Sequence, residues 1–191
     1  MALLLSSTYS QNVYSSNEAN KSCDIKIDSD DIEVHWTGYK FPTERKGVKG
    51  TLRNLGLKDN YKGKSLKSIL TGMSFNIDGR SVWSRNSRRD ARIVKYFFGK
   101  MISGTHIKGK VLEYSKDSLT MLLNMNGMAK EVTLKVTNQE NKMTAKGNID
   151  VLEGGMSKSL NAINKECSSL HKGKTWSDVD IKLTLTYEKD C

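Results

Sequence analysis

The sequence predicts an all-β protein whose strands form one closed antiparallel barrel. Three observations predict it: apolar and polar residues alternate along many segments, turn sequences separate those segments, and only two stretches have helical periodicity. Such alternation is typical of strands with one buried and one solvated face. A two-layer sandwich would bury one face per strand equally well, but only a barrel also removes the open sheet edges. We therefore expect a barrel of about eight strands.

The alternating segments follow one another along the chain. They cover residues 32–37, 48–53, 73–78, 105–111, 119–125, 132–136, 143–149 and 179–187. Asn126-Gly127 lies between two of them, and this dipeptide is a strong hairpin signal. Gly50, Gly109 and Gly147 occupy inward positions, where the missing side chain permits bending or the close approach of a neighbour or a ligand.

Two segments break the alternation and predict helices near the barrel mouth. Residues 156–170 place apolar side chains three and four residues apart, which is typical of an amphipathic helix. Lys172-Gly173 is expected to end it. Residues 88–98 form a shorter helical segment with apolar side chains on one side and basic side chains on the other.

The chain contains three cysteines, so one remains after any single disulfide. In an antiparallel barrel the first strand begins beside the end of the last strand, which would bring Cys23 within disulfide distance of Cys191. This pairing is favoured, and pairings that include Cys167 stay open. Cys167 lies on the apolar side of the longer predicted helix, so it is expected to be a buried, unreactive thiol.

With 191 residues the chain fits one barrel domain, expected over residues 23–191. Residues 1–22 begin with apolar Ala2–Leu5 and continue with small and polar residues. We expect them to be the remnant of a secretory signal or a disordered N-terminus. A signal would make the protein periplasmic or secreted. No apolar stretch approaches the ~20 residues of a transmembrane helix.

The charge is +10, from 31 Lys and Arg against 21 Asp and Glu, which permits an anionic partner. Only 7% of residues are aromatic, so few stacking platforms are available for single strands and no nucleic acid is expected. Basic residues gather around the short predicted helix. They form either a solvated helix face or a docking patch for an anionic headgroup or membrane surface: Arg80, Arg85, Arg88, Arg89, Arg92 and Lys95.

An eight-stranded barrel is filled by its own side chains or holds one small ligand. The inward positions mix small residues with Leu, Phe and several of the eight Met residues, which give an adaptable lining. The predicted lining residues are Trp36, Phe75, Ile77, Phe97, Phe98, Ile107, Leu119, Met121, Leu123, Met125, Leu134, Met156, Leu160, Ile163 and Leu183.

No catalytic or metal-binding pattern stands out, because HExxH, GxSxG, P-loop and CxxC sequences are all missing. His35 and His106 fall on the polar side of strands and are expected to be solvated. His171 follows the longer helix, where the dipole favours a cation. We expect no enzyme activity, no metal and no cofactor, while an enzyme acting on a lipid in the lumen stays open as an alternative.

Four sequence pieces in order resemble YceI-like domains, the polyisoprenoid-binding proteins of bacteria, over about residues 30–189. They are Trp36–Lys40 with Gly47–Thr51, Arg89–Ile93 followed by Phe97-Phe98, Asn126–Val132, and Asp178–Ile181. The family's usual Pro after the Phe-Phe pair is absent, and Lys100-Met101-Ile102 stands there instead.

The resemblance implies a lipocalin-like antiparallel barrel, exported to the periplasm, that holds a long amphiphile and has no enzyme activity. A homodimer is also possible within the family. We therefore expect non-enzymatic binding or transport of an isoprenoid, an isoprenoid quinone, or a fatty amide or acid. The alternative is a polyanion- or membrane-surface-binding module that acts through its basic patch and has a filled barrel.

Overall fold

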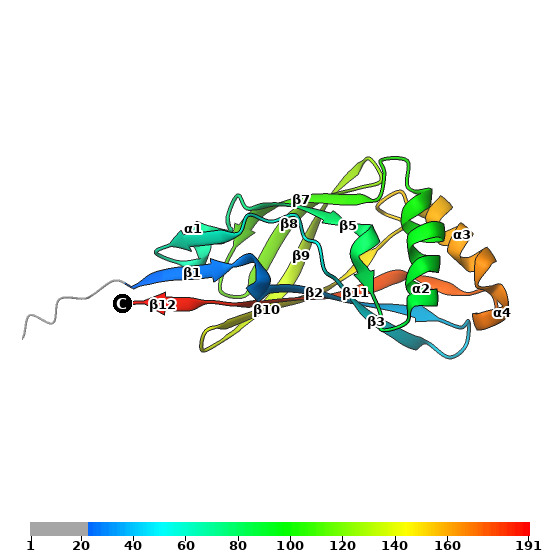
Figure 1. Ribbon diagram of the computed structural model, residues 1–191, viewed down its shortest axis with the longest axis horizontal. Coiled ribbons are helices and arrows are strands. Elements are labelled where there is room, and N and C mark those ends of the chain that lie inside the picture. The colour runs from blue at the N-terminus through cyan, green and yellow to red at the C-terminus, as the bar shows by residue number, and fades with distance from the viewer. Residues whose placement is uncertain (1–22) are drawn as a thin grey trace, which may run out of the picture.

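A computed structural model describes residues 23–191, which form an antiparallel barrel with a small second sheet at one end (Figure 1). The barrel strands are β2 (Ile32–Lys40), β3 (Lys46–Leu52), β5 (Ser74–Asp78), β6 (Val82–Trp83), β7 (His106–Tyr114), β8 (Ser118–Met125), β9 (Met128–Gln139), β10 (Lys142–Asp150) and β11 (Thr175–Thr186). Their spatial order is β5-β7-β8-β9-β10-β11-β2-β3-β6. Each of the eight predicted segments is a strand, and the two-residue β6 is the ninth strand of this sheet.

The large sheet nearly closes into a barrel, because the chain that follows β3 lies beside β5. After Leu52 the chain continues along β5 instead of β2. The amide of Asn76 donates to the carbonyl of Leu55, and the amide of Asp78 donates to the carbonyl of Asn54, both at 3.0 Å. These hydrogen bonds show that the sheet forms a barrel and not a sandwich. The alternation and the turns of the sequence predict this barrel.

The small sheet joins both ends of the described chain. It consists of β1 (Asp24–Asp28), β4 (Asn60–Gly63) and β12 (Glu188–Asp190), in the order β12-β1-β4. The predicted disulfide Cys23–Cys191 joins the start of β1 to the end of β12, with the two Cα atoms 4.2 Å apart. Cys167 is free and buried, as expected. The predicted signal remnant or disordered segment at residues 1–22 lies outside the described residues.

Short helical segments pack beside the small sheet. They are η1 (Ser29–Asp31) and α1 (Leu66–Leu70), whereas η2 (Gly79–Ser81) joins β5 to β6 at the helical end, where the ring of Phe98 lies against Gly79. Ser65 and Ser68 form a capping box at the start of α1, which buries Leu66, Ile69 and Leu70. These elements and the strands of the small sheet are too short to show a period, so the sequence does not predict them.

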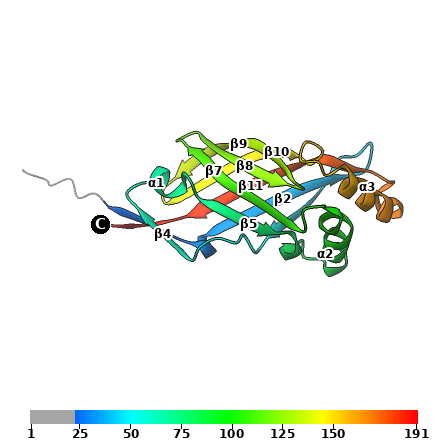
Figure 2. The ribbon, with the colours of Figure 1, turned by 90° about the horizontal axis from the view of Figure 1, so that it is seen from above.

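The other helices gather at the opposite end of the barrel (Figures 1 and 2). The shorter predicted helix is α2 (Ser87–Arg92), which continues through the π-helix η3 (Ile93–Phe97) into η4 (Phe98–Lys100). The longer predicted helix is α3 (Ser157–Glu166) followed by α4 (Ser168–His171). Within the described residues, no helix is long and apolar enough to cross a bilayer.

The longer helix differs from the prediction at its C-terminal end. It is interrupted at Cys167, whose φ of −99° and ψ of 13° leave the helical range. The axis turns there, so Leu170 is 53% exposed although the spacing places it on the apolar side. The helical pair ends at Lys172 and Gly173 as predicted, with φ of 54° and 69°.

Candidate functional site

The barrel encloses an apolar cavity of about 110 Å³, and every side chain that lines it is apolar. Nine of the fifteen predicted lining residues border this cavity: Phe75, Ile77, Ile107, Leu119, Met121, Leu123, Met125, Leu134 and Leu183. The other six lie closer to the helices, where Phe98, Met156, Leu160 and Ile163 are buried and Trp36 and Phe97 are partly buried.

Further lining residues come from β2, β3 and the segment after β3. Ile32, Val34 and Leu52 follow the alternation of their strands, so their inward position was readable from the sequence. Leu55 and Leu57 also border the cavity, but they lie outside any strand. Only the tertiary structure brings this segment against the lumen.

The inward glycines are covered by side chains of neighbouring strands. The ring of Trp36 lies over Gly50, the ring of Phe75 lies over Gly109, and a methyl group of Leu134 lies over Gly147. Side chains of the protein therefore fill the space that the sequence predicted at these three glycines. This packing narrows the lumen.

The exposure of some inward side chains differs between the two ends of the barrel. Toward the small sheet, Leu119, Leu134 and Met143 are at most 1% exposed. Toward the helices, the inward residues Ile149 and Ile181 are only partly buried. On β10 and β11 the lumen side chains are therefore more accessible toward the helical end.

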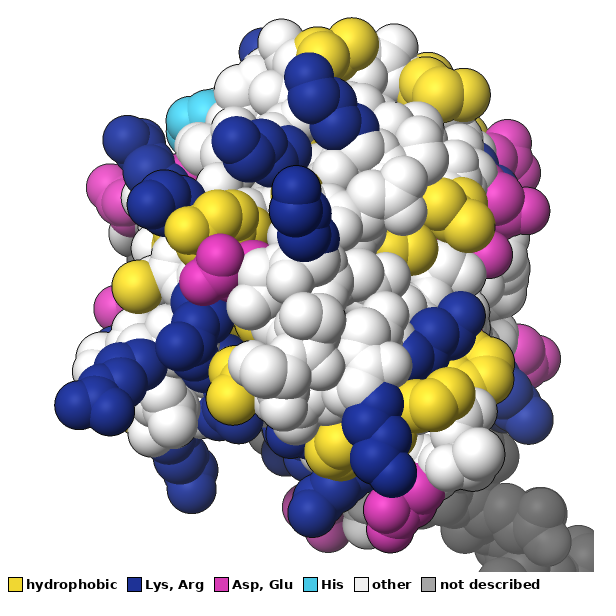
Figure 3. Space-filling view, turned by 90° about the vertical axis from the view of Figure 1, so that its right-hand side faces the viewer, with side chains coloured by type: hydrophobic (Ala, Val, Ile, Leu, Met, Phe, Trp, Pro, Cys, Tyr) yellow, Lys and Arg dark blue, Asp and Glu magenta, His cyan; other side chains and the backbone are white. Residues whose placement is uncertain are grey.

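The basic residues around α2 do not form one continuous patch. Arg80 forms an ion pair with Asp78 at 2.8 Å, and Arg92 faces Glu166 at 3.7 Å. Arg89 donates to the hydroxyl of Ser84 at 2.7 Å and to its carbonyl at 2.6 Å. The other three, Arg85, Arg88 and Lys95, form no ion pair with a carboxylate of the described residues. Figure 3 faces this end and shows Lys and Arg side chains separated by uncharged and apolar surface.

The Arg-Asp pair of the sequence resemblance has a structural role. Asp90 accepts from the amide of Ser84 at 3.0 Å and also from its hydroxyl. Together with Arg89, it holds the chain after β6 against the start of α2. The pair thereby fixes the helical cap relative to the barrel wall.

Two of the three histidines differ from the sequence expectation. His171 is buried, and its Nδ1–H donates to the carbonyl of Lys174 at 3.1 Å. Burial lowers the pKa of His171, which disfavours the dipole-stabilised cation that the sequence suggests. The Nδ1 of His106 is enclosed without a hydrogen-bond partner, so His106 is not fully solvated. His35 is partly exposed and contacts Glu33 at 2.9 Å.

The described residues contain no group of three or more metal-ligating side chains. Burial raises the pKa of the Cys167 thiol, which keeps it protonated at neutral pH. The geometry therefore offers an apolar container.

Solved structures with the same architecture identify the fold. A polyisoprenoid-binding domain from Saccharophagus degradans, implicated in plant cell wall breakdown, matches with a TM-score of 0.59 and 12% identity, over 86% of this chain and 97% of that domain. BcnA from Burkholderia cenocepacia matches with a TM-score of 0.58 and 14% identity, over 83% and 98%. This chain has the YceI-like fold.

A YceI protein from Campylobacter jejuni matches as well, with a TM-score of 0.55 and 13% identity, over 78% of this chain and 89% of that protein. No family model and no curated protein matches the sequence. The likeness to YceI-like proteins is thus a likeness of fold, and it confirms the fold that the four short sequence pieces suggest.

Proposed function

We propose that this protein binds a long-chain amphiphile in the lumen of its YceI-like barrel and carries it without chemical change. The candidates are an isoprenoid, an isoprenoid quinone, or a fatty amide or acid. The observation that carries the proposal is the cavity inside the barrel, whose lining is apolar on every side. The polyisoprenoid-binding domain with the same fold supports the choice of ligand class.

Transfer of a chain from water into such a lumen is favourable by about 0.8 kcal/mol per buried methylene. Ordering of the chain and loss of its free motion offset part of this gain. No catalytic group is needed for a carrier of this kind. Specificity would come from the length and width of the lumen and from a few polar groups at its margin.

The cavity has to widen when a long chain binds. Its volume of about 110 Å³ is well below the ~300 Å³ at which binding sites for larger ligands begin. Met73, Met121, Met125 and Met143 all line it. Methionine side chains change rotamer readily and fit irregular apolar surfaces, so they are the residues expected to move.

Native mass spectrometry and organic extraction of protein purified from cells test this proposal. We expect a co-purified lipid in the wild type. Leu123→Trp should abolish lipid retention because Leu123 lines the cavity, whereas Leu122→Trp should retain lipid because Leu122 points outward and is 40% exposed. Absence of lipid from the wild type, together with no binding of added isoprenoid or fatty amide, would refute the proposal.

Export to the periplasm or secretion is part of the proposal, because the Cys23–Cys191 disulfide is stable in oxidising compartments. The polyanion- or membrane-binding alternative predicts a steep loss of binding with salt. Burial of a chain without a charged headgroup predicts little salt dependence, so a salt titration with such a ligand separates the two functions.

A further inference from the structure

The barrel wall separates on one side, where β2 and the chain after β3 diverge. The β2–β3 ladder ends at the pair Val34–Leu52. In the described part of the chain, the next backbone hydrogen bond between the two segments is from the amide of Ser29 to the carbonyl of Asp59, at 3.0 Å. Figure 1 shows the segment after β3 leaving β2 on its way to α1. We call the space between these two connections the side window.

A groove of about 890 Å³ lies outside the side window. Residues 29–35 form one of its walls, and residues 49–57 form the other. Five apolar residues border both this groove and the lumen cavity: Ile32, Val34, Leu52, Leu55 and Leu57. The lumen and the outer groove are thus separated at the side window by apolar side chains.

The far part of the groove carries cations beside an aromatic ring. The guanidinium of Arg53 lies 3.8 Å from the ring centre of Trp83, and that of Arg85 lies 5.5 Å from it. Both arginines are exposed, and neither pairs with a carboxylate of the described residues. Stacking on Trp83 holds the two guanidinium groups near each other while their N–H groups stay available.

The groove also contains Lys49 and two acidic residues, Asp30 and Glu33. Glu33 contacts His35 at 2.9 Å, which partly occupies its carboxylate. The arginines at Trp83 are therefore the groups best placed to bind an anion. Arginine binds phosphate and carboxylate with two parallel hydrogen bonds.

We propose that the side window is the route by which the chain reaches the lumen, and that Arg53 and Arg85 bind its phosphate or carboxylate headgroup. This inference rests on the proposed function. Only apolar side chains separate the groove from the lumen there, so movement of these side chains would open a path for the chain. The apolar lumen cavity then accepts the tail.

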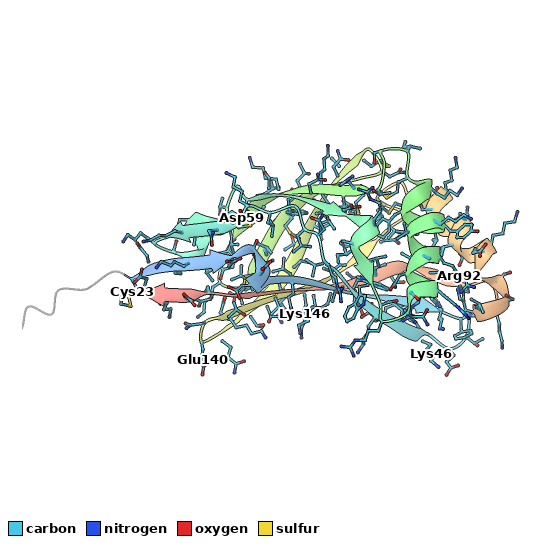
Figure 4. The ribbon with its side chains drawn as sticks, in the orientation of Figure 1. Cys23, Lys46, Asp59, Arg92, Glu140 and Lys146 are labelled. Carbon is cyan, nitrogen blue, oxygen red and sulfur yellow. A yellow bond between two sulfur atoms is a disulfide. The ribbon has the colours of Figure 1, made fainter. Side chains whose placement is uncertain are left out.

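The test compares two ligands with the same chain, geranylgeranyl diphosphate and geranylgeraniol, by titration calorimetry. Arg53→Gln/Arg85→Gln should raise the Kd of the diphosphate about tenfold, since the loss of a charge-assisted contact costs at least that much. The Kd of the alcohol should change less than about twofold, because its chain contacts are intact. Lys142→Gln/Lys146→Gln removes two exposed charges from β10, where Figure 4 labels Lys146, and should alter neither affinity.

Three results would overturn the proposed route through the side window and its headgroup site. The first is an unchanged diphosphate affinity in Arg53→Gln/Arg85→Gln while the alcohol still binds. The second is a larger loss in Arg88→Gln/Lys95→Gln, which would place the headgroup at the helical end. The third is equal affinity for inorganic diphosphate and the lipid diphosphate, which would show an anion site unconnected with the lumen. If the wild type binds neither lipid, the proposed function itself fails.

Discussion

At the scale of single residues, orientation toward the lumen decides what a side chain does. Leu122 and Leu123 are neighbours in β8, yet the first is 40% exposed and the second is 4% exposed. Strand geometry turns successive side chains to opposite faces. The same residue type therefore contributes to the surface at one position and to the lumen at the next.

Substitution of a lumen leucine should destabilise the protein far more than substitution of an outward one. Leu134→Ala, at a site with no exposure, should lower the free energy of unfolding by about 2–5 kcal/mol. Leu112→Ala, at a site that is 40% exposed, should change it by less than about 1 kcal/mol. Urea unfolding of both variants measures the difference, and similar midpoints would contradict the assigned orientations.

His171 should make stability depend on pH. Its pKa is lower in the folded state than in the unfolded chain, so the unfolded chain binds the proton more readily. The stabilisation is complete above about pH 6.5 and is lost as the pH falls through the lowered pKa. We expect the free energy of unfolding to decrease between pH 7.5 and 5 and His171→Gln to reduce this slope. A His171 pKa of 6.5 or more in an NMR titration would contradict the assignment.

At the scale of elements, contacts between loops position the segments that cap the barrel. Asn126 illustrates this. The sequence predicts it as a hairpin residue, and it has the expected positive φ of 53°. Its side chain also accepts from the amide of Ile102 at 2.5 Å and donates to the carbonyl of Gly155 at 2.6 Å. One side chain thereby ties the β8–β9 hairpin to the chain after η4 and to the loop before α3.

Two substitutions at Asn126 separate its turn role from its tertiary role. Asn126→Gly keeps the positive φ and removes both hydrogen bonds, so it should cost about 1–3 kcal/mol of unfolding free energy. Asn126→Ala should cost about 1 kcal/mol more, because alanine is strained at this φ. Thermal or urea unfolding provides the measurement. Wild-type stability of Asn126→Gly would show that the two bonds contribute nothing.

At the scale of the whole molecule, the two ends of the barrel are built differently. One end is held by the small sheet and by a disulfide between residues 168 positions apart. The other end is covered by α2, η3 and α3, which pack on one another. The pairing of β1 with β12 puts the two ends of the described chain side by side, so the disulfide stabilises the closure of the fold.

Removal of this disulfide should weaken the fold without changing it. Cys23→Ser/Cys191→Ser should lower the free energy of unfolding by about 2–5 kcal/mol, because the bridge closes a very long loop. Reduced wild-type protein should unfold at the same denaturant concentration as the double variant. Equal stability of oxidised and reduced wild type would contradict this role. The Cys167 thiol should stay unreactive in native protein, since it is buried.

The sequence by itself determined the eight main strands, the two helical segments, the favoured disulfide and most of the lumen lining. Those features depend on periodicity and chain order, which local residue patterns encode directly. The small sheet, the break at Cys167 and the burial of His171 were decided by the tertiary structure. So was the side window, because Leu55, Leu57, Arg53 and Trp83 come together only where β3 leaves β2 to close the barrel on β5. Such contacts between distant segments have no period in the sequence, and only packing in three dimensions selects them.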